Sequence, residues 1–347
     1  MSLAPRLRSW GRAAAAALLP CILALGVGAV VLVATGHAPL KIYGEMAVQA
    51  LGSEARLAAT LTATTPLLFT GLATALAFRA GIFNVGVEGS FHLGGLAAAW
   101  VAGASALAGW GAGAVLPALA FGLLVGAAWM ALPAWLQARL GVDEVVTTLM
   151  LNFVALGIAA WLVNGPLLAP GSANSATRTI AEAARLPRLL PPSSLNAGLL
   201  IALALLALYA LWDRWAVLGL ETRLHGLNPR YSRAQGVNVP RLVGLCFVAS
   251  GAIGGLGGAA HALGVVYKYS VGFSPGYGFT GIAVALLARG SALGILLAAL
   301  LFGALASAGT TIQFFHDVPL EITGIIQGAI MIFAVADLMR WQRRRRA

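Results

Sequence analysis

The segment Gly81–His92, with the sequence GIFNVGVEGSFH, places polar side chains inside an otherwise apolar region. Glu88 and His92 are four residues apart, so on a helix they share one face and can form a hydrogen bond. A charged side chain at the centre of a membrane helix costs about 2.5–3.5 kcal/mol, and such residues usually face a bundle interior or a water path. The glycines indicate a broken helix whose free backbone groups can meet a polar solute. We therefore expect Asn84, Glu88 and His92 to line a solute pathway. The alternative is that Glu88 only caps a helix or pairs locally.

Asn152 is a fourth candidate for this pathway, because it lies in an apolar run just after the polar stretch Asp143–Thr148. A buried Asn that satisfies a neighbouring helix explains it equally well. No paired acids or metal-ligand cluster accompany these residues, and Cys21 and Cys246 both lie in apolar runs. We therefore expect no catalytic residues, no metal site and no cofactor bound by this chain.

Two glycine-rich stretches have structural explanations. Gly276–Gly281 matches G-x-G-x-x-G, but a dinucleotide site needs a preceding strand in a βαβ unit, and here the motif joins apolar segments. Glycines at a break between helices explain it better. The cluster from Gly251 to Gly258 has the small-x-x-x-small spacing that lets helices approach closely. Neither Lys41 nor Lys268 lies in a Walker A loop, so the chain is not expected to hydrolyse ATP by that route.

A short basic helix is predicted within Leu220–Arg241, the longest charged segment that also has folding signals. Asn228 is a good N-cap, Pro229 suits the first helical position, and Gly236 can close the end in a left-handed conformation. The helix Pro229–Gln235 would then carry Arg230 and Arg233 on one side. We interpret it as a docking element for another protein.

The composition is that of an all-α polytopic membrane protein. Hydrophobic residues make up 60% of the 347 residues and charged ones only 10%, whereas soluble domains have about 25% charged residues. The chain has room for about ten transmembrane helices of ~20 residues. We predict spans at Ala13–Thr35, Arg56–Phe78, Phe83–Ala104, Gly111–Gln137, Val145–Val163, Asn196–Trp212, Leu242–Val266, Phe279–Ala288, Leu293–Ile312 and Ile322–Met339. The piece Phe279–Ala288 is too short to cross alone, so we expect a half-span or a re-entrant element there.

The distribution of basic residues orients these spans. With the N-terminus in the cytoplasm, the inner segments hold 16 of the 22 Lys and Arg residues, as the positive-inside rule requires. Both termini are then cytoplasmic, and the basic tail 340–347 is an orientation signal that contacts lipid rather than nucleic acid. The proline-rich stretch Asn164–Asn196 falls outside the membrane, either as a solvated connector or as a contact for an extracytoplasmic partner.

Four stretches together resemble a known family, the permease subunits of ATP-binding-cassette (ABC) importers. They are TPLLFTGLATALAFRAGIFNVGVEGS (Thr65–Ser90), VDEVVTTLMLNF (Val142–Phe153), GLNPRYSRAQGV (Gly226–Val237) and GFSPGYGFTGIAVALLA (Gly272–Ala288). The chain is most similar to the branch with ribose, branched-chain amino acid and nucleoside systems, and within it to the nucleoside permeases. Ser90 departs from the Gln expected in the family's NIGxEGQ pattern.

The resemblance implies an importer of the bacterial cytoplasmic (inner) membrane. It implies two permease subunits, an ABC ATPase that binds ATP and Mg²⁺, and an extracytoplasmic substrate-binding protein. The second permease is expected to be a related, non-identical chain. The Asn228–Gly236 helix corresponds to the family's cytoplasmic coupling element, which ATP-driven closure of the ATPases would move while the spans alternate between outward-open and inward-open states.

The chain is accordingly expected to be one transmembrane domain, with N-terminal spans at 13–219, a coupling loop at 220–241, C-terminal spans at 242–339 and the basic tail. The expected solute is a nucleoside; simple sugars and branched-chain amino acids are the alternatives. An ion-coupled secondary transporter is the competing class. It would need a coupling site, for which Glu88 and His92 are the candidates, and it would leave the docking helix unexplained.

Overall fold

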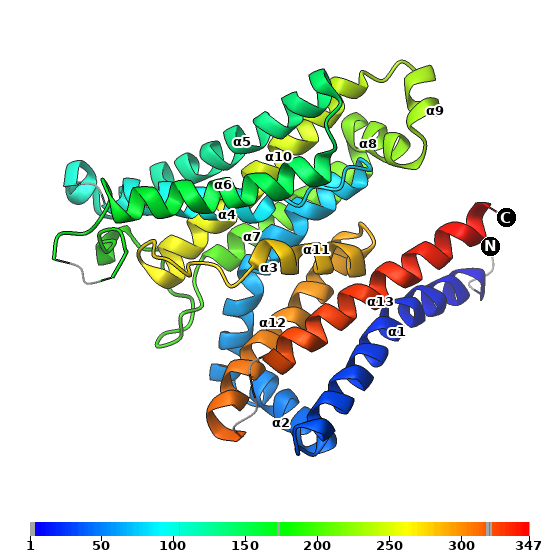
Figure 1. Ribbon diagram of the computed structural model, residues 1–347, viewed down its shortest axis with the longest axis horizontal. Coiled ribbons are helices and arrows are strands. Elements are labelled where there is room, and N and C mark those ends of the chain that lie inside the picture. Colours follow the sequence, from blue (N-terminus) through cyan, green and yellow to red (C-terminus); the bar gives the residue numbers. More distant parts are fainter. Residues whose placement is uncertain (1–3, 104, 172–173, 317–318, 320, 347) are drawn as a thin grey trace.

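The computed structural model describes residues 4–103, 105–171, 174–316, 319 and 321–346, and every regular element within them is helical (Figure 1). The side chains of 4–18, 105–109, 314, 316 and 337–346 lie outside this description, and with them the basic residues expected at both termini. The elements are α1 (Ala4–Ala34), α2 (Pro39–Leu51), α3 (Glu54–Arg79), α4 (Val87–Gly103), η1 (Ser105–Ala114), α5 (Val115–Leu140), α6 (Glu144–Asn164), η2 (Glu182–Ala184), α7 (Gly198–Trp215), α8 (Val217–Leu227), α9 (Pro229–Ala234), α10 (Val239–His261), the π-helical η3 (Ala262–Val266), α11 (Tyr277–Ala288), α12 (Ala292–His316) and α13 (Glu321–Arg346).

Six helical segments among the described residues are long and apolar enough to cross a membrane, and a seventh is added if the bent pair α1–α2 counts as one span. The expected number of about ten is therefore not confirmed. Two of the expected spans, Ala13–Thr35 and Ile322–Met339, extend into residues whose side chains lie outside the description. Three local differences are also present. Pro39–Leu51, expected in a connection, forms a helix bent by 118° from α1. The expected span Phe83–Ala104 becomes helical only at Val87, and α11 has only 12 residues, as the half-span prediction requires.

The long helices run in roughly one direction, whereas α2 is bent by 118° from α1, and most connections lie at two ends of the bundle (Figure 1). The ends of α1 and α13 lie towards the end where α9 is also found, whereas the segment between α6 and α7 lies at the opposite end. The predicted topology requires this arrangement, because it puts both termini and the docking helix on one side. Their cytoplasmic placement stays a prediction.

The central helix is α3, with 78% of its most apolar window buried inside the protein. It contains buried threonines, which a membrane interior would penalise if their hydroxyls lacked partners. Each of Thr64, Thr65, Thr70 and Thr74 donates to the carbonyl oxygen four residues earlier, at 2.8–3.1 Å. These four hydroxyls are therefore satisfied within the helix, which can occupy the middle of the bundle.

Glycines let α10 approach α4 and α5 with backbone against backbone. A Cβ atom added to Gly126 of α5 would lie 2.7 Å from the Cα of Gly255, and one added to Gly94 of α4 would run into the Gly255 carbonyl group. Gly251 and Gly258 make similar approaches, to Gly126 and to the carbonyl of Phe91. The packing role predicted for the cluster from Gly251 to Gly258 is thus confirmed.

We expect Gly255→Ala to destabilise the protein, because its methyl group would overlap the backbone of α5; overpacking of this kind costs about 1–3 kcal/mol. The matched control is Gly244→Ala on the same helix, where an added Cβ meets nothing within 4 Å. Thermal unfolding of the two detergent-solubilised variants measures the difference. Equal midpoints would show that α10 and α5 can separate without cost.

Candidate functional site

The helical path breaks between the end of α3 at Arg79 and the start of α4 at Val87. Gly81 adopts a positive φ of 73° in this break, a conformation that glycine tolerates without a side-chain clash. Unwound backbone at membrane depth leaves N–H and C=O groups that must find partners within the protein. The polar side chains predicted for the site supply those partners.

Asn152 on α6 holds the break from one side. Its Nδ2 donates to the Val85 carbonyl at 3.0 Å, and its Oδ1 accepts from the Gly89 N–H at 2.9 Å. One turn earlier, the Thr148 hydroxyl oxygen accepts from the Val85 N–H at 3.2 Å. Asn152 and Thr148 therefore act as side-chain partners for both sides of the interrupted backbone, which is the alternative role considered for Asn152.

Asn84 holds the break from the other side. Its Oδ1 accepts from the Gly86 N–H at 2.8 Å, and its Nδ2 donates to the Ser250 hydroxyl of α10 at 2.9 Å. Ser250 in turn donates to the Ala73 carbonyl of α3 at 2.8 Å. The fully buried Asn84 side chain is thus fixed between its own turn and two neighbouring helices.

Glu88 lies where the first turns of two helices meet. It belongs to the first turn of α4, and its Oε2 accepts from the N–H of Gly278 in the first turn of α11. A Cβ atom added to Gly278 would lie 2.6 Å from the Cα of Glu88, so only a glycine fits there. Helix N-termini carry free N–H groups and partial positive charge, which favour a carboxylate. Glu88 therefore joins the first turn of α4 to the first turn of the short helix α11.

His92 extends this hydrogen-bonded chain towards the segment between α6 and α7. Its Nε2 lies 3.2 Å from Glu88 Oε1, as the four-residue spacing predicts, and its Nδ1 lies 2.8 Å from the Tyr269 hydroxyl. The Tyr269 N–H donates to the Thr177 hydroxyl at 2.9 Å. A continuous path of polar contacts thus runs from α11 through α4 to the loop predicted to lie outside.

The four residues predicted for the solute pathway are therefore brought together, and each is at least 96% buried. In this conformation their hydrogen-bond partners are groups of the protein, so their common role here is to stabilise the helix break. Their contact with a solute stays a prediction. Sequence reasoning missed Thr148 and Gly278, although Thr148 and Asn152 have the same four-residue spacing as Glu88 and His92.

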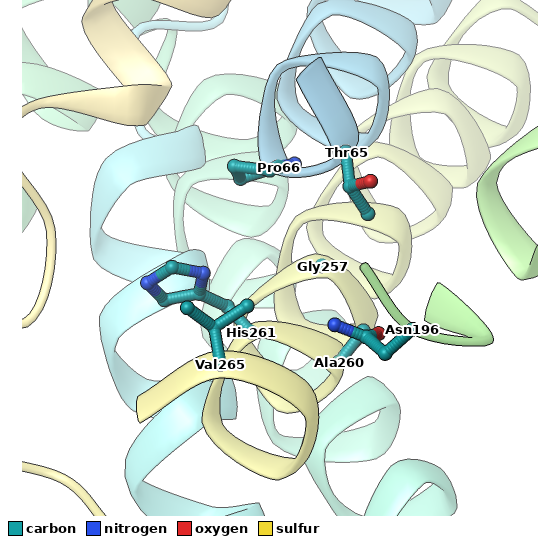
Figure 2. Close-up of a pocket in the computed structure, with 7 residues that line it drawn as sticks. All are labelled: Thr65, Pro66, Asn196, Gly257, Ala260, His261 and Val265. Atoms are coloured by element: carbon teal, nitrogen blue, oxygen red, sulfur yellow. The ribbon is translucent and has the colours of Figure 1, made fainter. Parts of the chain in front are cut away.

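A small cavity borders this region between α3 and the α10–η3 helix (Figure 2). Figure 2 shows Thr65 and Pro66 on one side, His261 and Val265 on another, and Asn196 opposite His261. The His261 Nδ1 is buried without a hydrogen-bond partner. The cavity volume of about 10 Å³ suits a single water molecule, so it does not accommodate a sugar or a nucleoside.

The predicted basic helix is present as α9, ending at Ala234, one residue earlier than expected. Asn228 caps it by accepting from the N–H groups of Arg230 and Tyr231, both at 3.1 Å. Pro229 takes the first helical position, and Gly236 follows the end with a φ of 83°. The capping signals read from the sequence are confirmed.

Arg230 and Arg233 are both exposed on α9, and Tyr231 between them is half exposed. The neighbouring His225 of α8 is buried, and burial, with a smaller contribution from the charge of Arg233, lowers its pKa below the usual 6.5. Its ring is therefore neutral at pH 7, and the positive charge of this surface belongs to the arginines. Such a surface fits a protein partner that offers acceptors or acidic groups.

The sequence is similar to one family and to several known proteins. Residues 56–335 match the family described as the branched-chain amino acid transport system / permease component. The chain is 36% identical over 332 residues to the glucose ABC transporter permease protein TsgB13 of Haloferax volcanii, covering 92% of this chain and 86% of that protein. It is 32% identical to the nucleoside ABC transporter permease protein NupB of Lactococcus lactis, covering 91% and 89%. A second permease of that organism, NupC, is 28% identical, covering 79% and 88%. No solved structure matches the chain significantly.

We expect Glu88→Leu to lower the yield of folded protein far more than Glu88→Gln. The glutamine keeps an oxygen acceptor for the Gly278 N–H, whereas leucine leaves that buried donor without a partner, at a cost of about 1–3 kcal/mol. Size-exclusion profiles and unfolding midpoints of the purified variants measure the effect. If both substitutions are equally harmless, Glu88 does not hold α11 against α4.

Proposed function

Since the chain belongs to the family of branched-chain amino acid transport system permease components, we propose that it moves a nucleoside into the cytoplasm through an ATP-driven importer. The family and the relatives make it a multi-pass membrane protein and the permease subunit of an ABC transporter of the sugar or nucleoside class. It is a transport subunit, and ATP is hydrolysed by a separate ATPase subunit. The observation that carries the importer class is α9, a self-capped basic helix that a secondary transporter would not need. The choice of a nucleoside rests on the similarity to NupB.

In the proposed mechanism, a binding protein delivers the solute to the outer face, and the solute passes between two permease subunits. The ATPases bind ATP and Mg²⁺, and their closure displaces α9. The spans then exchange outward-open and inward-open states. The break held by Asn84, Glu88, His92 and Asn152 is proposed to face the solute in one of these states, when the surrounding spans move away from it and its own hydrogen bonds stay intact. We place the assembly in the bacterial cytoplasmic membrane.

The second permease is proposed to be a related but different chain. Lactococcus lactis contains two nucleoside permeases, NupB and NupC, that both match this sequence, at 32% and 28% identity. An importer built from two different permeases would explain why one organism has two that differ in their similarity to this chain. The basic α9 surface then contacts the ATPase, and the loop between α6 and α7 is available to the binding protein.

We expect the double variant Arg230→Glu/Arg233→Glu to lose uptake by on the order of tenfold or more, because like-charge juxtaposition at an interface costs several kcal/mol. The ATPase should also co-purify less, while the amount of permease in the membrane stays normal. The control Arg139→Glu/Arg214→Glu reverses two other exposed charges outside the coupling loop 220–241 and should keep normal uptake. Normal uptake in the α9 variant would mean that the helix is only a solvated turn.

Glucose is the second candidate solute, since TsgB13 is named a glucose permease and is 36% identical to this chain. We expect the assembled importer to accumulate labelled guanosine or uridine in proteoliposomes, and excess unlabelled nucleoside to compete when excess glucose does not. The reverse pattern of competition would replace the nucleoside with a sugar. Uptake that persists without the ATPase would contradict the importer mechanism for either solute.

A further inference from the structure

Asp213, near the end of α7, lies close to two arginines from two other elements. The Arg79 guanidinium donates through Nε and Nη2 to the two carboxylate oxygens, each at 2.9 Å. The Arg223 Nε of α8 lies 3.8 Å from Asp213 Oδ1. Two parallel hydrogen bonds fix the relative direction of the guanidinium and carboxylate planes. Asp213 therefore ties the end of α3 to α7, and the Arg223 Nε of α8 lies close to the same carboxylate without a hydrogen bond to it.

The backbone of α8 also contacts the turn after α3. A Cβ atom added to Gly81 would lie 3.2 Å from the Gly226 Cα, and one added to Gly226 would run into the Arg79 carbonyl oxygen. Only glycines allow this approach. Since α9 follows α8 after the single residue Asn228, a displacement of α9 reaches the α3–α4 turn through a contact without flexible side chains.

The same place contacts the far end of α11. A Cβ atom added to Gly290 would lie 3.1 Å from the Arg79 Nη1, and the Tyr209 hydroxyl of α7 donates to the Gly290 carbonyl at 3.0 Å. Arg79 thus lies beside the residues that directly follow α11, and the first turn of α11 is held by Glu88. Arg79 therefore contacts elements next to both α4 and α11, the two helices that Glu88 joins.

We propose that Asp213 is a positioning residue that transmits the movement of α9 to the α4–α11 junction through Arg79 and Arg223. The inference rests on the proposed function of α9 as the ATPase-coupling helix. When α9 moves, α8 carries Gly226 and Arg223 with it. Asp213 of α7 lies beside Arg223 of α8 and is paired with Arg79 at the end of α3. Through Asp213, the α3–α4 turn then follows α8 instead of sliding past it.

A purely structural brace is the competing explanation, and the ratio of uptake to ATP hydrolysis separates the two. The side chains of Asp213 and Arg79 keep only 21% and 26% exposure, so this bidentate pair also stabilises the fold. A brace alone predicts less folded protein with a normal ratio of uptake to ATP hydrolysis. The coupling role predicts a lower ratio in the protein that does fold.

The test measures ATP hydrolysis and solute uptake in proteoliposomes that contain the full chain with its partner permease, ATPase and binding protein. Labelled guanosine and labelled glucose are tested separately. In Asp213→Asn we expect normal ATPase co-purification and hydrolysis, with about tenfold less uptake per ATP, the effect of losing one charge-assisted interaction. The control Arg214→Gln removes the exposed neighbouring charge and should keep the normal ratio.

A double-mutant cycle checks that Asp213 acts through Arg79. Arg79→Gln, Asp213→Asn and the double variant should all show the same loss, whereas independent roles would make the losses multiply and would contradict the proposal. If Asp213→Asn does not fold, Arg79→Lys, which keeps the charge but lacks the planar fork, decides the question by the same ratio. A normal ratio with the ATPase bound overturns this inference alone; an ATPase that never binds the unmodified chain overturns the proposed function.

Discussion

The structure depends on one constraint, that a helix interrupted inside a membrane must still satisfy its backbone groups. The break between α3 and α4 exposes such groups at Val85, Gly86 and Gly89. A side chain within the break, Asn84, and side chains from α6 bind them. The first turn of α11 has the same need, which the Glu88 carboxylate meets. The polar residues in this apolar chain therefore cluster where regular hydrogen bonding stops.

Glycine makes these contacts possible, because the partners approach by their backbones. Gly278 admits the backbone of Glu88, and Gly281 admits Thr70 of α3. These are two of the three glycines in the G-x-G-x-x-G sequence; the third, Gly276, adopts a φ of 93° at the N-cap of α11. The motif is thus explained by a turn and two close helix contacts rather than by a dinucleotide site.

Features that depend on neighbours in the sequence were predictable, and features that depend on distant segments were not. The cap of α9 and the Glu88–His92 contact follow from spacings of two to four residues. The contact of Glu88 with Gly278 joins residues 190 positions apart, and that of Arg79 with Asp213 joins residues 134 apart. No periodicity encodes such pairs. The span count of about ten is not confirmed for a related reason: α2, α4 and α11 are short, and their ends lie at turns and tertiary hydrogen bonds that hydrophobic length does not encode.

A junction that is fully satisfied within the protein can move only as a unit. Separating α4 from α11 would expose the Gly278 N–H and the Glu88 carboxylate together, and separating α4 from α6 would release Asn152 from two backbone groups. Each step leaves buried polar atoms without partners, which is costly in an apolar environment. Sliding at the membrane-facing surfaces involves no such loss. A force applied at the Arg79 end of the break is therefore expected to displace the half-helices together, and a change in access to the solute follows from their joint movement against the surrounding spans.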